Sequence, residues 1–279
     1  MNSNYAYIYD DFLADRKFER EVAGLETKLN TYDLAGRIGR LTLFRSAKDL
    51  VEGMVKQGAT TVVIVGNDST LDKTMWFLPD LNVTIGYIPL VGPGEVGKLL
   101  GIPTGVSACD VLAARLIETL DMGKLDDRYF LTEVRVPATT AALDIEGKYR
   151  VAPSSGGSIT IRNLGGRQGN SIIPSDAKDG YLEAIVAPHE PDKKGFWVHA
   201  PKTKSTQMLL RQGEIISKDP LEAFADNHAV SGFRFSVGIV PQKIKFITGR
   251  GRTLADGDAS LQKSRRNDTF RSASESVRR

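Results

Sequence analysis

The residues best suited to chemistry are one polar loop and a few carboxylates. The loop consists of Gly66, Asn67, Asp68, Ser69 and Thr70. It follows the unbroken β-branched run 60–65 and precedes residues that favour a helix. A strand that leads through such a loop into a helix presents backbone N–H groups and a helix N-terminus, and both favour phosphate. The pattern indicates a phosphate-binding loop, and the alternative is an ordinary turn capped by Asp68 or Ser69.

A second loop, rich in glycine and proline, follows the next expected strand. It runs from Pro89 to Glu95 and includes Gly92 and Gly94. Open α/β sheets bind ligands beyond the carboxyl ends of their strands, where successive loops lie together. We therefore expect the two loops to flank one ligand.

The carboxylates follow turn or helix signals. Asp121 comes after an expected helix, Asp179 precedes Gly180, and Asp256 and Asp258 flank a glycine. Each Asp-Gly pair taken alone is most simply a turn. Their occurrence together with the two loops favours a functional role over a simple turn.

The elements that must position these residues begin with alternating strand and helix signals. Expected strands cover 5–9, 41–44, 60–65 and 83–90, and expected helices cover 16–29, 47–57, 71–78 and 107–120. Alternating βα units predict a doubly wound parallel sheet, and the run 60–65 has the composition of a strand buried on both faces. We place this α/β domain at residues 1–123.

From about residue 124 the helix signals become rare. Short alternating runs appear at 130–136, 158–161, 181–186, 196–199, 207–210, 233–240 and 243–247. Runs of this kind separated by turns predict a mostly antiparallel β-sandwich over residues 124–262. The polar, Ser- and Arg-rich stretch 263–279 is expected to be a flexible basic tail.

Composition narrows the function classes. Of the 279 residues, 41% are hydrophobic and 25% charged, which is typical of a globular protein, and the net charge is only +3. That charge permits contact with an anionic surface without implying nucleic acid. The single cysteine, Cys109, is expected to be buried and indicates a reducing compartment. With no signal peptide and no long apolar run, we expect a soluble cytoplasmic protein.

Taken in order, these motifs resemble the diacylglycerol kinase catalytic family of bacterial lipid kinases, which partly shares its fold with NAD kinases. Residues 65–71 (Val-Gly-Asn-Asp-Ser-Thr-Leu) stand where the family has Gly-Gly-Asp-Gly-Thr after a strand. Further similarities occur at residues 88–90, 100–103, 120–123, 129–130, 163, 173–182 and 255–258. The resemblance implies an NAD-kinase-like α/β domain and an ATP- and Mg²⁺-dependent lipid kinase.

The resemblance also implies roles for single residues. Asp68 and Thr70, with the backbone of the loop at Gly66, would contact the phosphates of ATP. Gly92, Gly94 and Glu95 align with the family's second nucleotide-binding loop. Asp121 and Asp258 stand where the family has a catalytic acidic pair. In that scheme Asp258 accepts the proton of the lipid hydroxyl as it attacks the γ-phosphoryl group.

A metal site is implied as well. Asp179 matches a metal ligand that is assisted in the family by backbone carbonyls, here those of Asp176 and Tyr181. Oxygen ligands of this kind suit Mg²⁺. The implied partner is a lipid substrate, reached by peripheral contact at the inner face of the membrane, with no nucleic acid. A homodimer is left open.

Two other functions stay open, and departures from the family pattern motivate the first of them. Asn67 and Ser69 replace two glycines, Asp258 replaces a glutamate, and the second loop loses its threonine and asparagine. The family's N-terminal Asn-Pro motif is also missing, with Asp10 and Asp11 near its place. The first alternative is therefore a catalytically impaired nucleotide-binding module. The second is an NAD kinase, which shares the Gly-Gly-Asp-Gly-Thr type of loop, and the late elements around Asp179 and Asp258 argue against it.

Overall fold

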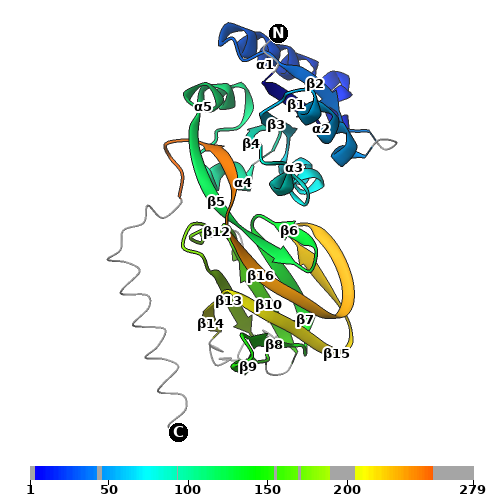
Figure 1. The fold of residues 1–279 in the computed structure, drawn as a ribbon, viewed down its shortest axis with the longest axis vertical. Coiled ribbons are helices and arrows are strands. Elements are labelled where there is room, and N and C mark those ends of the chain that lie inside the picture. The colour runs from blue at the N-terminus through cyan, green and yellow to red at the C-terminus, as the bar shows by residue number, and fades with distance from the viewer. Residues whose placement is uncertain are drawn as a thin grey trace, which may run out of the picture.

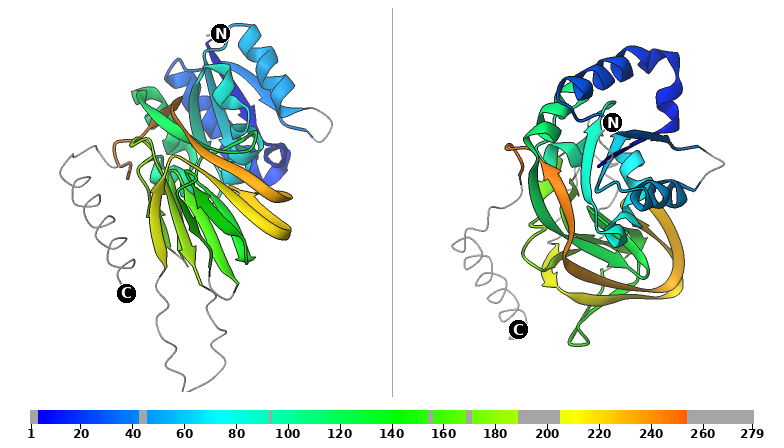
Figure 2. Two further views of the ribbon diagram at one scale, coloured as in Figure 1. Left: turned by 60° about the horizontal axis from the view of Figure 1, so that its bottom comes forward. Right: turned by 45° about the horizontal axis from the view of Figure 1, so that its top comes forward.

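The computed structural model describes residues 4–42, 46–92, 94–153, 156–168, 171–188 and 205–253. An α/β part comes first along the chain and a strand-rich part follows (Figure 1). Figure 2 shows the two parts from further directions, with the helices gathered in the first part and the fan of strands in the second. The expected order along the chain, with the α/β part first and an antiparallel, strand-rich part second, is confirmed.

The α/β part is built on a parallel sheet. Its elements are β1 (Tyr5–Tyr9), α1 (Glu19–Thr31), β2 (Arg37–Arg40), α2 (Ala47–Lys56), β3 (Thr61–Gly66), α3 (Asp68–Met75), β4 (Thr84–Pro89), α4 (Glu95–Leu99) and α5 (Ala108–Ala114). The strand order is β2-β1-β3-β4, and every neighbouring pair is parallel. All six residues of β3 are buried, as its β-branched composition predicts.

Helices cover both faces of this sheet. A Cβ added at Gly86 of β4 would lie 2.9 Å from Leu112 Cδ1 of α5, so this residue faces α5. Successive residues of a strand point to opposite faces. The next residue, Tyr87, accordingly points the other way and donates its hydroxyl to Asp68 of α3. Helices α3 and α5 therefore lie on opposite faces, which is the arrangement of a doubly wound sheet.

The second part consists almost entirely of strands. They are β5 (Leu116–Leu125), β6 (Arg128–Phe130), β7 (Glu133–Thr139), β8 (Ala142–Ile145), β9 (Tyr149–Val151), β10 (Gly157–Arg162), β11 (Gly165–Gln168), β12 (Ser171–Pro174), β13 (Leu182–Ala187), β14 (Thr206–Leu210), β15 (Gln212–Ala225) and β16 (His228–Thr248). All pairings among these strands are antiparallel. The core of this part is formed by aliphatic residues from alternate positions of the strands and by Phe130 and Phe235.

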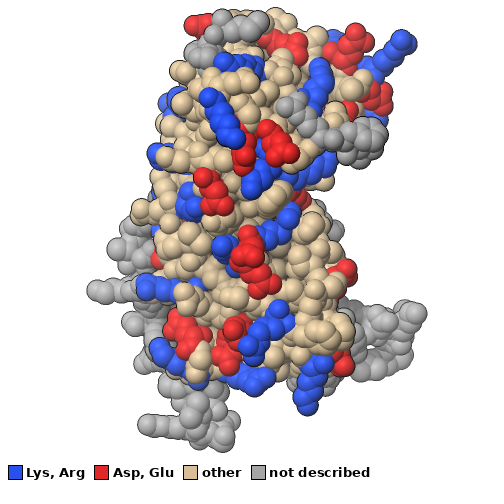
Figure 3. Space-filling model, turned by 45° about the vertical axis from the view of Figure 1, so that its right-hand side comes forward, with Lys and Arg blue, Asp and Glu red and all other residues tan. Residues whose placement is uncertain are grey.

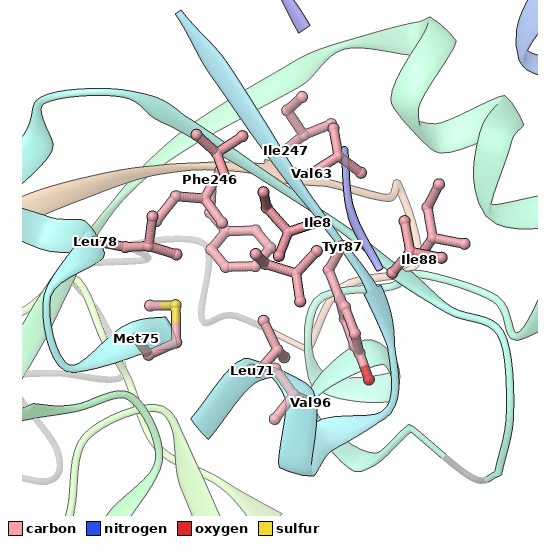
Figure 4. Packing of buried hydrophobic residues seen from close by; sticks show 14 of the residues in the cluster. Ile8, Val63, Leu71, Met75, Leu78, Tyr87, Ile88, Val96, Phe246 and Ile247 are labelled. Atoms are coloured by element: carbon pink, nitrogen blue, oxygen red, sulfur yellow. The ribbon is translucent and has the colours of Figure 1, made fainter. Parts of the chain in front are cut away.

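Strand β16 joins the two parts. Its first half pairs with β15, while Lys245 and Phe246 pair in parallel with Thr84 and Ile85 of β4. Figure 4 shows Phe246 in the core of the α/β part, together with Ile8, Leu71 and Leu78. Residues near the end of the described chain therefore complete the first sheet, and hydrogen bonds connect 14 strands in one sheet.

Several expected elements are confirmed and others are displaced. The strands at 5–9, 60–65 and 83–90 and the helix at 47–57 are present. The helix expected at 107–120 is wrong beyond Ala114, because Arg115 has a φ of 50° and the following residues form β5. The strand expected at 41–44 lies at Arg37–Arg40 instead, and α3 begins at Asp68 rather than at residue 71. The run 196–199 lies outside the described residues.

Cys109 has the expected place in the core. Its side chain in α5 is fully buried, and burial raises the pKa of the thiol to about 11. A thiol is nucleophilic only as the thiolate, so Cys109 is a packing residue.

Candidate functional site

The loop at Gly66 is held by a reciprocal cap. Asn67 accepts a hydrogen bond from the backbone N–H of Thr70 at 3.1 Å, and the Thr70 hydroxyl accepts one from the N–H of Asn67 at 2.9 Å. This capping box starts α3 at Asp68, three residues before the start expected from the apolar pattern. A Cβ at Gly66 would lie 2.1 Å from the Thr70 hydroxyl oxygen, so the turn requires glycine there.

The side chain of Thr70 points into the protein. It is fully buried, and its hydroxyl donates to Asp10 at 2.7 Å. Asp10 follows β1, is 1% exposed, and also accepts hydrogen bonds from Lys73 Nζ at 2.9 and 3.0 Å. Burial tends to raise the pKa of Asp10, but hydrogen bonds from Asp11, Thr70 and Lys73 together lower it. Asp10 and Thr70 therefore fix α3 against the end of β1.

Asp68 joins the two expected loops. Its carboxylate accepts hydrogen bonds from the Tyr87 hydroxyl at 2.9 Å and from the backbone N–H of Glu95 at 2.7 Å. Glu95 is the first residue of α4, so Asp68 caps that helix. Burial raises the pKa of Asp68, against the effect of these hydrogen bonds. The structure thus brings the Gly66 loop and Glu95 together at the carboxyl ends of β3 and β4, as expected.

The remaining residues of the two loops are at or near the surface. Ser69 is exposed in the first turn of α3. Gly92 is exposed with a φ of 82°, a conformation that favours glycine. Gly94 is buried, and a Cβ there would lie 2.8 Å from Pro89 Cβ. Ser69 and Gly92 are therefore exposed residues of this pair of loops.

A cleft of about 120 Å³ lies between α3 and α4 on one side and β7, the start of β11 and the turns before β7 and β16 on the other. Its lining is Asp68, Leu71, Asp72, Met75, Glu95, Val96, Leu99, Leu131, Thr132, Glu133, Arg135, Gly165, Asp226 and Asn227. Figure 1 shows α3 directly above β6, at the junction of the two parts. The outline in Figure 3 narrows at mid-height between the two parts, and acidic and basic side chains are interspersed on that face. Residues from both parts meet at this cleft.

Asp121 lies on strand β5 and not after a helix, which corrects its expected position. Its side chain is 1% exposed, and its two oxygens accept backbone hydrogen bonds from Gly180 at 2.8 Å and Gln242 at 2.7 Å. The backbone of Asp121 is also bonded to Ala177 and to the Asn163 side chain. Asp121 therefore holds the loop before β13 against the irregular middle of β16.

The expected metal ligands lie beside Asp121. Asp179 accepts a hydrogen bond from the N–H of Tyr181 at 2.9 Å, and Asp176 accepts one from the N–H of Lys178 at 3.0 Å. Burial raises the pKa of Asp179 to about 6, and the neighbouring carboxylates of Asp176 and Asp121 add to the rise.

The expected metal ligands, the Asp179 carboxylate and the backbone carbonyls of Asp176 and Tyr181, stay a prediction. Within the described ranges, no group of three or more His, Cys, Asp or Glu side chains is arranged to hold a metal. Both oxygens of the neighbouring Asp121 carboxylate accept backbone N–H groups. Mg²⁺ is usually bound by one or two carboxylates together with waters and substrate phosphates.

The expected site residues fall into two groups. Asp68 and Glu95 line the cleft beside α3, whereas Asp121 and Asp179 line a shallow depression of about 500 Å³ together with Gly180 and Gln242. Asp258, expected to pair with Asp121, lies outside the described residues, as does Asp256.

Several residues at the junction were not singled out from the sequence. Asp72 and Lys73 lie on α3 one turn beyond Asp68 and Ser69, and the i, i+4 spacing from Asp68 could have indicated Asp72. Asp226 begins the β15–β16 turn with a φ of 52°, and the Asp-Asn pair is a turn signal. Nothing in the sequence indicates that this turn reaches α3.

The fold and the joined loops define a two-part α/β and β protein with its loops at the carboxyl edge of a parallel sheet. No protein-family model and no curated protein matches the sequence. Among solved structures, the chain is similar to a diacylglycerol kinase from Bacillus anthracis str. Sterne, with a TM-score of 0.73 and 13% identity over 90% of this chain and 98% of that chain. A further chain named as a diacylglycerol kinase from the same organism has a TM-score of 0.72, 12% identity and coverage of 90% and 99%.

These similarities show that the chain has the fold of bacterial diacylglycerol kinases, in a form that has diverged in sequence. The resemblance expected from the motif order is confirmed at this level. In the described part of the chain, no helix has the length and apolar character needed to cross a bilayer.

Proposed function

We propose that this protein is a lipid kinase that transfers the γ-phosphoryl group of ATP to a lipid hydroxyl, with a diacylglycerol-like acceptor. The observation that supports it most directly is the joining of the two loops by Asp68 beside a cleft, in a chain with this fold. Ligands of open α/β sheets bind at this edge. The NAD-kinase-like detail of the α/β part and the two-layer arrangement of the β part belong to the same proposal.

The proposed phosphate site uses the accessible groups of the loops. The Ser69 hydroxyl and the backbone near Gly92 are exposed, and Lys73 is 47% exposed beside them on α3. Asp68 and Thr70 were expected to contact phosphate directly, but their side chains bond within the protein, so we propose that they shape the loops. Lysine and backbone N–H groups are common phosphate donors.

The cofactor and the location belong to the proposal. ATP would be the phosphoryl donor, and Mg²⁺ dependence stays a prediction, as does the pairing of Asp121 with Asp258. Peripheral contact with the inner face of the membrane follows from the proposed acceptor, because a lipid hydroxyl lies at the bilayer surface. We propose no nucleic-acid partner.

A second candidate is a nucleotide-binding module without turnover. The observation that favours it is the replacement of two loop glycines by Asn67 and Ser69, because a Cβ limits how closely phosphate can approach the backbone. An NAD kinase is the third candidate.

One experiment separates these candidates. The purified chain is incubated with γ-labelled ATP, Mg²⁺ and phosphatidylcholine–phosphatidylglycerol vesicles containing diacylglycerol, and labelled lipid is extracted. In parallel, the melting temperature is measured with and without ATP. The kinase predicts labelled lipid and a stabilisation by ATP. Asp68→Ala should remove both, because α4 loses its cap, while the control Glu222→Ala alters an exposed side chain of β15.

The other outcomes assign the alternatives. Stabilisation by ATP without labelled lipid supports the non-catalytic module. Formation of NADP from NAD and ATP supports the NAD kinase. No stabilisation and no transfer would contradict all three, and equal transfer by Asp68→Ala and wild type would contradict the assigned loop.

A further inference from the structure

The cleft beside α3 contains a carboxylate with no role in the loops. Asp72 lies one helical turn after Asp68, on the same face of α3, and is partly exposed in the cleft. Across the cleft, the turn between β15 and β16 brings Asp226 and Asn227 to it. Asp72 thus faces the strand-rich part across the cleft, one helical turn after the loop at Gly66.

Asp72 is held in position by the opposite wall. Asn227 Nδ2 donates a hydrogen bond to one oxygen of Asp72. That turn is itself fixed, because the Asp226 carboxylate accepts hydrogen bonds from the N–H groups of Leu131 at 2.9 Å and Thr132 at 2.8 Å and from the Thr132 hydroxyl. The hydrogen bond from Asn227 holds the carboxylate of Asp72 from one side, and the carboxylate stays open to the cleft.

We propose that Asp72 accepts the proton of the acceptor hydroxyl during phosphoryl transfer. This inference rests on the proposed kinase function and goes further by assigning the base to α3 in place of Asp258. The hydroxyl oxygen forms a bond to the γ-phosphorus, and the bond from the γ-phosphorus to the bridging oxygen breaks, so that ADP leaves with the electron pair. The hydroxyl proton moves to Asp72 and then to solvent at the mouth of the cleft.

The surroundings of Asp72 suit a base that works near neutral pH. Burial raises the pKa of Asp72 to about 7, and the carboxylate of Asp226 adds to the rise, while Asn227 and Arg128 oppose it. A general base is most effective when its pKa lies near the working pH. The charged and titratable groups that face Asp72 are Asp68 on α3, Glu95 on α4, Arg128 on β6, Glu133 and Arg135 on β7, and Asp226 in the β15–β16 turn, with His228 beside Arg128.

The test compares Asp72→Asn with Asn227→Ala in the vesicle assay over pH 5 to 9. Asp72→Asn keeps the shape of the side chain, and it should lower kcat by about 100-fold or more while the stabilisation by ATP is unchanged. Asn227→Ala keeps the base but removes the hydrogen bond that lowers its pKa. The rising limb of its pH–kcat/KM profile should therefore move to higher pH than in wild type.

The control variant is Glu222→Ala, which should match wild type. Asp258→Asn removes the base expected from the family resemblance, and a loss of about 100-fold in kcat in that variant alone overturns the role of Asp72. The role of Asp72 is overturned if wild type is active and Asp72→Asn keeps more than a tenth of the wild-type kcat. The kinase proposal stays intact in that case. A pH limb that does not move in Asn227→Ala also overturns it. If wild type shows no transfer, both proposals fail together.

Discussion

Replacing Asp121 by alanine separates a structural role from a chemical one. The carboxylate accepts two backbone hydrogen bonds, from Gly180 at 2.8 Å and Gln242 at 2.7 Å. A hydrogen bond to a charged group contributes about 1.5–3 kcal/mol, and the lower value applies because Gly180 is half-buried and Gln242 is exposed. We expect Asp121→Ala to lower the free energy of unfolding by about 3 kcal/mol, from two such bonds at the lower value.

The measurement is urea unfolding followed by fluorescence, with the free energy obtained by linear extrapolation. Glu222→Ala is the control, because it removes an exposed carboxylate of β15 and should change stability by no more than about 0.5 kcal/mol. A loss below about 1 kcal/mol for Asp121→Ala would refute the reasoning from its hydrogen bonds.

Asp121→Asn extends the same test. The amide keeps one acceptor but turns an NH₂ group toward a backbone N–H, so this variant should also lose stability. A variant that is as stable as wild type yet inactive would instead assign Asp121 a chemical role, as the family resemblance implies.

Two further predictions concern the cleft and the loop. The folded pKa of Asp72, about 7, lies above its ordinary value of 3.8, so ionisation costs stability as the pH rises through this range. The stability of Asp72→Asn relative to wild type should therefore increase between pH 5 and pH 8, by on the order of 2 kcal/mol. Melting temperatures in a pH series measure this change. A stability difference between the two proteins that stays constant with pH would contradict the prediction. Gly66→Ala should cost about 2 kcal/mol or more and weaken the stabilisation by ATP, because the new Cβ would lie 2.1 Å from the Thr70 hydroxyl oxygen and open the capping box. Chemical denaturation and melting with ATP measure these effects, and a fully stable variant would show that the turn can relax.

Elements whose conformation depends on their own residue types could be predicted from the sequence, and β3 is the main example. The run at β3 is β-branched throughout, and such a run is stable only when both faces are covered. The same reasoning failed at Leu116–Leu120, where the residues suit a helix or a strand. Their conformation depends on pairing with residues 244–248 of β16, and nothing near them in the sequence indicates that partner.

The site residues also divide into those with a local sequence signal and those whose role depends on distant partners. The loop at Gly66 could be found because glycine, asparagine and serine after a buried strand have a local meaning. Asp10 and Asp226 could not be assigned in this way, since each acts through donors far away in the sequence. Asp121 was noticed for its place in a motif order, but its backbone partners depend on the folded loop before β13.

The path of β16 has a consequence for synthesis of the protein. As the chain leaves the ribosome, β4 has no partner on one edge until residues 245 and 246 arrive, after nearly all of the strand-rich part. Contacts this distant in sequence close slowly, and an open apolar edge invites pairing with other chains. The first part to be synthesised is therefore among the last to be completed. A ribosome that stalls before β16 would release a chain whose first sheet is unfinished.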